Sequence, residues 1–245
     1  MRNKYNKMIE DFRSYGIELT DRQLEQFDQY FNILVRVNEV MNLTAITDFD
    51  DVCKLHFVDS ISCTPFVDFK DKDYSIIDIG TGAGFPGIPL KIVFPNLHIT
   101  LLDSLNKRIN FLNEVIDTLG LNEVGSIETL HGRAEDFSSS KNGTLREKFD
   151  FAVSRAVANM STLTEYCLPY VKVGGEFIAF KGDKGSEEVE TAKRAIHLLG
   201  GKLKECKDFF LPGTDIARTI CVVEKKEHTS KQYPRKAGTP AKNPL

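Results

Sequence analysis

Three alternating glycines near residue 80 are the first residues whose type and spacing could bind a ligand. The segment 78–84 reads DIGTGAG and follows an apolar run, and Pro86 marks the start of a helix. Glycine has no Cβ, so a turn of this kind lets a ligand approach the backbone closely. The N–H groups at the start of the next helix favour an anionic group such as a carboxylate or a phosphate. We therefore expect Gly80, Gly82 and Gly84 to belong to a ligand-binding loop.

An acidic residue lies at the end of the next apolar run. Asp103 follows Gly80 by 23 positions, and an offset of roughly 20 residues is typical of a carboxylate that binds the ribose of a nucleotide cofactor. Asp103 could also cap the helix that follows it. In another register the residues 82–87 match G-x-G-x-x-G, so a dinucleotide site stays open. Asp78, two residues before the first glycine, favours the methyltransferase version of the loop.

Further polar residues follow three later apolar runs. The segment 132–136, GRAED, is placed for contacts to an adenine edge, although alone it would be an ordinary polar loop. Arg155 and Lys181 each lie at the end of a run. Ligands of open α/β sheets bind at the carboxyl ends of the strands, so these two residues are expected to flank one cleft. Either could contact a cofactor or a phosphate group.

The elements that must position these residues alternate between apolar runs and amphipathic stretches from Tyr74 onward, which is typical of a parallel sheet with crossover helices. We expect strands at 75–79, 98–103, 126–131, 149–154 and 175–181, and helices at 87–94, 105–119, 160–171 and 186–199. Two more strands, 202–211 and 217–225, are joined by a turn so short that they must be antiparallel. A mostly parallel seven-stranded sheet with a closing antiparallel pair is typical of the class I, Rossmann-like methyltransferase fold, and less so of dinucleotide dehydrogenases.

Roughly the first seventy residues are expected to be helical. Thr20 and Gln23 form a capping box for a helix whose apolar stripe reaches Met41. Asp48 can cap a further helix that reaches Ile61. The predicted parts of the chain are a helical extension at 1–72, a class I methyltransferase domain at 73–227 and a basic tail at 228–245.

Charge is distributed unevenly along the chain. The net charge of −3 divides into +5 from Lys225 onward and −8 for the rest, and such a basic end suits phosphate contacts. The stretch after Glu227 is too rich in Pro, Lys and Gly to pack a core, so we expect it to become ordered on RNA or at the cofactor cleft. A disordered, solubilising tail is the alternative.

No apolar run is long enough to span a bilayer, and the N-terminus lacks the apolar core of a signal peptide. We therefore expect a cytoplasmic protein that does not bind a membrane. The five cysteines are widely spaced and form no C-x-x-C pair, so neither a disulfide framework nor a metal site is predicted. A monomer is expected.

These motifs together resemble the RsmG family, also called glucose-inhibited division protein B. The resemblance covers essentially the whole chain. It is carried by NLT at 42–44, His56, Asp59-Ser60, DIGTGAGFPGIP at 78–89, Asp103-Ser104 with Lys107-Arg108, GRAE at 132–135, SRA at 154–156, and YPRKAGTP at 233–240 with NPL at 243–245.

The resemblance implies an S-adenosyl-L-methionine-dependent enzyme that methylates N7 of a guanine in the decoding-region loop of 16S ribosomal RNA. Its expected partner is small-subunit ribosomal RNA or a ribosomal particle. Cofactor contacts are expected at Asp78, Gly80, Gly82, Gly84, Phe85, Asp103, Ser104, Ala134, Glu135 and Arg155. Candidates for RNA contacts are Lys181, Lys231, Arg235, Lys236 and Lys242.

Guanine N7 already carries the lone pair that attacks a methyl group, so this chemistry requires no general base. We assign no catalytic acid or base, and His56 is expected to be structural. The enzyme should act by placement and desolvation. The alternatives are a methyltransferase of the same fold that acts on another RNA or a small molecule, a nicotinamide-dependent oxidoreductase, and a non-catalytic ribosome-assembly factor.

Overall fold

The computed structural model describes residues 2–155 and 157–245, so Met1 and Ala156 lie outside the described residues. Within them, seven strands form one sheet in the order β3-β2-β1-β4-β5-β7-β6. The strands are β1 (Ser75–Ile79), β2 (His98–Asp103), β3 (Ser126–His131), β4 (Phe149–Arg155), β5 (Val171–Lys181), β6 (Gly201–Phe210) and β7 (Ala217–Lys225). Strands β1 to β5 are parallel, and β7 runs antiparallel to both β5 and β6. This confirms the mostly parallel sheet with a closing antiparallel pair.

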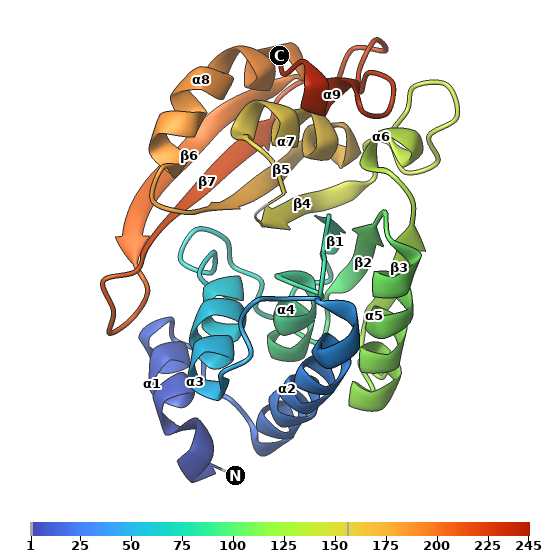
Figure 1. The fold of residues 1–245 in the computed structure, drawn as a ribbon. Helices are drawn as coiled ribbons and strands as arrows, with labels where there is room; N and C mark the ends of the chain where they lie inside the picture. The colour runs from blue at the N-terminus through green and yellow to red at the C-terminus, as the bar shows by residue number, and fades with distance from the viewer. Residues whose placement is uncertain (1, 156) are drawn as a thin grey trace.

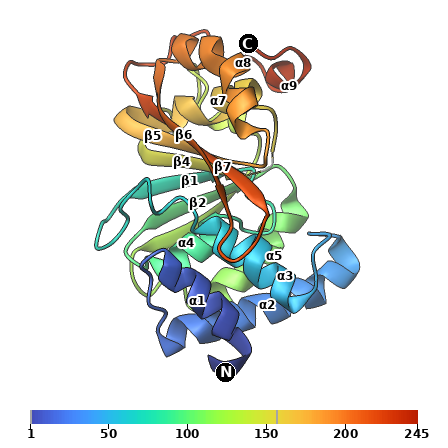
Figure 2. The ribbon, with the colours of Figure 1, turned by 90° about the vertical axis from the view of Figure 1, so that its left-hand side faces the viewer.

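Helices cover both faces of the sheet (Figure 1). They are α1 (Asn6–Ser14), α2 (Asp21–Met41), α3 (Phe49–Val52), α4 (Gly87–Val93), α5 (Asn106–Leu119), α6 (Ala134–Phe137), α7 (Met160–Cys167), α8 (Gly185–Leu198) and α9 (Thr239–Lys242), with 3₁₀ turns at Arg2–Tyr5 and Leu168–Tyr170. The N-terminal helices lie on one face together with α4 and α5. Helices α7, α8 and α9 lie on the other, as the turned view also shows (Figure 2). None of the described helices is both long and apolar enough to cross a membrane.

Each face of the sheet has its own hydrophobic core. Successive side chains of a strand point to opposite faces. In β1, for example, Ile76 belongs to the core under the N-terminal helices and Ile77 to the core under α7 and α8. The near-continuous burial of β1 and β2 follows from this, because a parallel strand is covered on both sides.

The start of the chain folds as the capping signals predict, except at one point. The side chain of Thr20 accepts from the Gln23 N–H and the Gln23 side chain accepts from the Thr20 N–H, which completes the capping box of α2. Asp48 caps α3 through two backbone N–H groups. The expected regular helix up to Ile61 is wrong, however, because the chain widens into a π-helical segment at Cys53–Val58. Such segments are frequent near functional sites.

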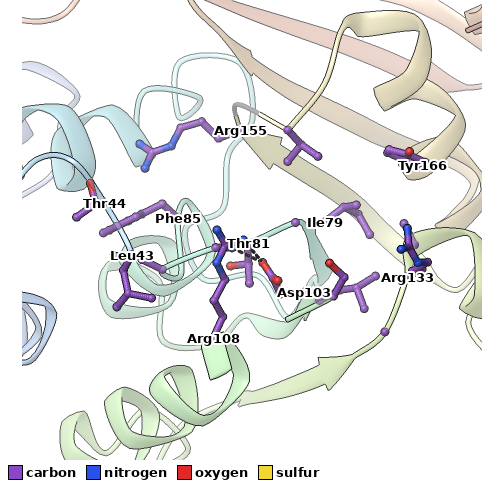
Figure 3. A pocket seen from close by; sticks show the side chains of 18 of the residues that line it. Leu43, Thr44, Ile79, Thr81, Phe85, Asp103, Arg108, Arg133, Arg155 and Tyr166 are labelled. Atoms are coloured by element: carbon purple, nitrogen blue, oxygen red, sulfur yellow. Dashed lines mark hydrogen bonds and ion pairs between the residues drawn. The ribbon is translucent and has the colours of Figure 1, made fainter. Parts of the chain in front are cut away.

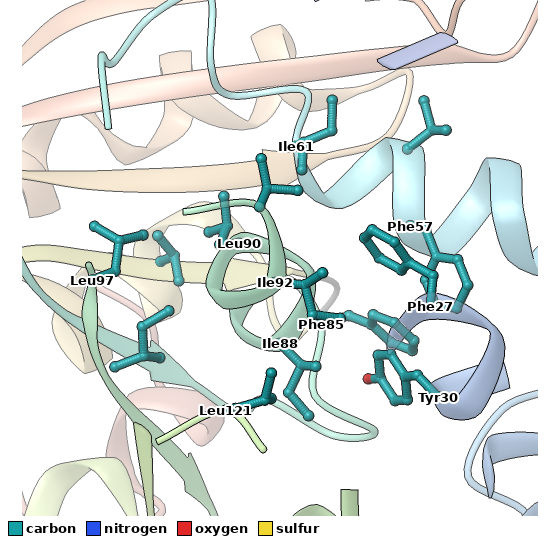
Figure 4. Close-up of a cluster of buried hydrophobic side chains, with 14 of the residues drawn as sticks. Phe27, Tyr30, Phe57, Ile61, Phe85, Ile88, Leu90, Ile92, Leu97 and Leu121 are labelled. Carbon is teal, nitrogen blue, oxygen red and sulfur yellow. The ribbon is translucent and has the colours of Figure 1, made fainter. Parts of the chain in front are cut away.

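An aromatic cluster joins the N-terminal helices to the glycine loop (Figure 4). The Tyr30 ring of α2 stacks on Phe57 and on Phe85, with centroids 5.4 Å apart in both pairs. The buried Tyr30 hydroxyl also donates a hydrogen bond to the carbonyl of Ala83. The N-terminal helices therefore support the loop directly.

The tail, residues 228–245, packs against the body. Tyr233 belongs to the core under α7, and Thr229 and Pro240 are also buried. Arg146 donates to the carbonyl oxygens of Thr229 and Tyr233 at 2.5 and 2.8 Å. The expectation that this stretch packs no core is therefore wrong, because a few apolar side chains and satisfied backbone groups fix it although its average composition is polar.

Candidate functional site

A cavity of about 480 Å³ opens at the carboxyl ends of β1, β2 and β4. We call it the first cavity. Figure 3 shows Asp103 and Arg108 at its β2 wall, with Thr44 and Arg155 on one side and Arg133 and Tyr166 on the other. It lies where open α/β sheets bind their ligands. The predicted residues that line it are Gly80, Gly82, Phe85, Asp103, Ser104, Ala134, Glu135 and Arg155.

The glycine loop forms the floor of this cavity. Gly80 and Gly82 have positive φ values of 69° and 63°, a conformation that residues with a Cβ rarely adopt. A Cβ at Gly80 would also lie 2.7 Å from Cγ2 of Val157, which lines the same cavity. Gly80 therefore meets both a backbone requirement and a spatial one, whereas Gly82 meets the backbone requirement alone.

Asp103 is a buried carboxylate with several donors around it. Its Oδ2 accepts from the N–H of Gly82 at 3.0 Å and from Nη1 of Arg108 at 3.1 Å. Its Oδ1 accepts from the N–H of Leu105 at 2.9 Å, directly before α5. Asp103 is not the N-cap of α5, because Leu105 holds that position and the helix has no side-chain cap; its carboxylate instead fixes the loop before the helix and faces the cavity.

Asp78 and Gly84 were expected to contact the cofactor, but the structure places them behind the loop. Asp78 is fully buried and accepts from the Thr81 hydroxyl at 2.7 Å and from the Gly87 N–H at 2.9 Å. Burial raises its pKa to about 7, and its Oδ1 has no hydrogen-bond partner among the described residues. A Cβ at Gly84 would meet Ile88 at 2.5 Å. Both residues shape the loop, because a buried acid and a close packing contact fix its path.

The β3 side of the first cavity is built around α6. Glu135 is only 6% exposed, yet it lines the cavity beside Ala134. Its Oε1 accepts from the N–H of Gly238 in the tail at 2.8 Å. Tyr166 of α7 closes the same side. The wall therefore joins three segments that are far apart in sequence.

The opposite side is built by the N-terminal helices and β4. The His56 ring stacks on Phe85 with centroids 4.4 Å apart and an interplanar angle of 14°. Nη2 of Arg155 lies 3.2 Å from Nδ1 of His56, and Oγ1 of Thr44 lies 2.9 Å from Nε2. Arginine only donates, so Nδ1 accepts and the proton is on Nε2. Burial and the charge of Arg155 lower the pKa of His56 to about 3, so the ring is neutral at physiological pH.

A second cavity of about 680 Å³ adjoins the first and shares His56, Arg155 and Val157 with it. The buried Asp59 pairs with Arg155 at 3.2 Å and with Arg218 of β7 at 3.1 Å. Arg155 therefore lies between the two cavities and shares the Asp59 carboxylate with Arg218. Ala156, the last residue of the SRA motif, lies outside the described residues.

Two of the candidates for RNA contacts are already engaged within the protein. Lys181 is buried, pairs with Glu188 at 2.7 Å and donates to the carbonyl of Ala158 at 2.8 Å. Arg235 forms a bidentate pair with the fully buried Glu165. An RNA contact by either residue would have to compete with these pairs, and both stay predictions, Lys181 as a residue that lines the second cavity. Lys231, Lys236 and Lys242 are exposed on the tail.

Several residues that line the first cavity were not predicted as site residues, among them Thr44, His56 and Tyr166. The motifs at 42–44 and His56 were visible in the helical region, but nothing local indicates that these helices fold back onto the glycine loop. Tyr166 gives even less of a signal, since it lies in an amphipathic helix among ordinary core residues.

Comparisons with known proteins agree with this geometry. A family model described as rRNA small subunit methyltransferase G matches residues 23–216. A protein of Lachnoclostridium phytofermentans named ribosomal RNA small subunit methyltransferase G is 51% identical over 97% of this chain and 96% of its own length. A protein of the same name from an Exiguobacterium species is 53% identical over 98% of each chain. The solved structure of an S-adenosylmethionine-dependent methyltransferase from Aquifex aeolicus is 16% identical, with a TM-score of 0.52 over 74% of this chain and 96% of that one, so it supports the fold alone.

Proposed function

The chain belongs to the rRNA small subunit methyltransferase G family, and from this premise we propose that it methylates N7 of a guanine in the decoding-region loop of 16S ribosomal RNA. It is an S-adenosyl-L-methionine-dependent methyltransferase. The observation that carries the finer proposal is the pair of adjoining cavities, which share His56, Arg155 and Val157 at the sheet edge. One cavity suits the cofactor, and the other suits the base.

The residues of the first cavity fit an adenosyl cofactor. The carboxylate of Asp103 suits ribose hydroxyl groups as donors, and the carboxylate of Glu135 suits an amino group on the α6 side. Apolar side chains also line the cavity, namely Ile79, Leu102 and Ala134. We propose that the cavity-lining members of the predicted set hold the cofactor in this way.

Bound S-adenosylmethionine supplies a methyl group activated on a sulfonium sulfur. The chain's own residues then need only to admit the base and exclude water, since N7 carries its lone pair. His56 suits this task because it is neutral, with both ring nitrogens engaged by Thr44 and Arg155. It positions the wall between the cavities and moves no proton.

We further propose that the exposed Lys231, Lys236 and Lys242 of the tail contact RNA phosphates. We propose that the chain is divided into a helical extension at 1–72, a methyltransferase domain at 73–227 and a tail at 228–245. In this division the tail binds RNA electrostatically and the second cavity recognises the base. The enzyme would work as a monomer in the cytoplasm, where ribosomal RNA is its substrate.

Mass spectrometry of 16S ribosomal RNA nucleosides from a deletion strain tests the proposal. We expect one 7-methylguanosine to be lost and to return when the wild-type chain is expressed, with its position in the decoding-region loop. Purified enzyme with labelled S-adenosylmethionine and small-subunit RNA provides the direct assay. Loss of a different modification, or no transfer to any ribosomal RNA or particle, would contradict the N7 assignment.

A further inference from the structure

The tail packs against the protein body next to the first cavity. It runs beside α7, and the short helix α9 packs there (Figure 1). The hydroxyl of Thr162 in α7 donates to the carbonyl of Pro240 at 3.1 Å, and both residues are buried. The tail is therefore tied down near its far end as well as at Tyr233.

Two of its ties end on buried carboxylates. The backbone N–H of Arg235 donates to Oε1 of Glu165 at 2.7 Å, and Nη2 donates to Oε2 at 2.6 Å. The N–H of Gly238 donates to Oε1 of Glu135 at 2.8 Å. Glu165 has no exposed side-chain surface, and Glu135 is only 6% exposed. A buried carboxylate that loses such donors is left with unsatisfied acceptors, which is costly, so these donors hold the two side chains in place.

One of these carboxylates lines the first cavity, and the other is next in sequence to a residue that lines it. Glu135 lines it directly, and Glu165 precedes Tyr166, which lines it from α7. Oε2 of Glu135 makes no hydrogen bond to any described residue, so it stays available to a ligand. Without the tail, Glu135 would lose its donor and Glu165 would lose its cation.

We infer that the tail is a strap that positions the Glu135 and Tyr166 wall of the first cavity, so that ordering of the tail and binding of the cofactor stabilise each other. This inference rests on the proposed function, since it takes the first cavity as the S-adenosylmethionine site. Arg235 and Gly238 are positioning residues that act through Glu165 and Glu135. The tail thus serves the cofactor, in addition to any contact that its exposed lysines make with RNA.

Titration of the full-length chain with S-adenosylhomocysteine tests the strap. Arg235→Ala should weaken affinity about tenfold, a coupling of ordinary size between two linked events. Arg235→Lys keeps the positive charge and the backbone N–H but cannot make the two-point guanidinium contact with Glu165. The affinity of this variant for S-adenosylhomocysteine should therefore lie between those of the wild type and Arg235→Ala. Gln232→Ala changes an exposed residue of the same tail and should bind as the wild type does.

Hydrogen exchange provides a readout that needs no substitution. Linkage is reciprocal, so S-adenosylhomocysteine should slow exchange of the Gly238 amide in the wild-type chain, and Arg235→Ala should speed exchange across the tail. The strap would be overturned if the tail of Arg235→Ala exchanges faster while its dissociation constant for S-adenosylhomocysteine is unchanged. It would also be overturned if the ligand does not change the exchange rate of the Gly238 amide in the wild-type chain. Failure of the wild-type chain to bind S-adenosylhomocysteine at all would overturn the cofactor assignment and the strap with it.

Discussion

Replacing Asp103 by alanine should weaken binding of S-adenosylhomocysteine by an amount that the structure bounds. A carboxylate offers about four acceptor positions. Three are taken by the N–H groups of Gly82 and Leu105 and by Nη1 of Arg108. One position therefore remains for a ribose hydroxyl. A charge-assisted hydrogen bond contributes about 1.5–3 kcal/mol, which corresponds to a loss of affinity of roughly tenfold to 150-fold.

Isothermal titration of Asp103→Ala against the wild type measures this loss. Asp117→Ala is the matched control, because Asp117 is an exposed carboxylate of the neighbouring helix α5. Thermal unfolding of each variant shows whether the loop survives, since the Gly82 N–H also loses its acceptor. A dissociation constant within about threefold of the wild type, in a variant that stays folded, would refute the role of Asp103. The loss of a charge-assisted hydrogen bond should weaken binding by more than that.

Three further predictions concern pH and salt. The pKa of His56 is lowered to about 3, so this residue should not titrate between about pH 6.5 and 8.5. The single-turnover rate at saturating RNA should therefore have the same pH profile in the wild type and in His56→Gln over this range. A bell-shaped pH profile that disappears in His56→Gln would contradict the mechanism. Burial raises the pKa of Asp78 to about 7, so between about pH 4 and 7 the folded chain holds a proton that the unfolded chain has released, and stability falls as pH rises. Denaturant titrations of Asp78→Asn should lack that slope, and an identical slope in both proteins would disprove it. Replacing Lys231, Lys236 and Lys242 by alanine should lower the logarithmic salt slope of RNA binding by roughly 0.7 to 0.9 for each phosphate that the protein no longer neutralises, whereas a slope equal to that of the wild type would remove these lysines from the proposal.

Most of the sheet could be predicted because its signals are local. The strands at 75–79, 98–103, 126–131 and 217–225 have the predicted ends, since turn residues separate them from the neighbouring elements. The bounds of the other strands and of the helices differ by a few residues. The closing antiparallel pair followed from the shortness of one turn, which is a covalent constraint rather than a statistical preference.

The candidate site was predicted where it depends on backbone geometry and missed where it depends on distant partners. Gly80, Gly82 and Asp103 line the first cavity because a strand-to-helix turn and a strand end carry their own signals. The engagement of Lys181 by Glu188 could not be anticipated, because no local pattern reveals which acid a buried lysine meets. The same holds for the tail, whose composition suggested disorder while Tyr233 anchors it in a core.

The contact of Tyr30 and Phe57 with the glycine loop bears on how this enzyme could be divided or recombined. A cut near residue 73 would separate all the strands from the helices whose aromatic rings back Phe85 and from Thr44 and His56 of the cavity wall. The sheet with its glycine loop therefore should not form a complete cofactor site when unrelated N-terminal helices are attached to it. Chimaeras between relatives should exchange the N-terminal helices together with the glycine loop, because the side chains of the helices pack directly against the loop.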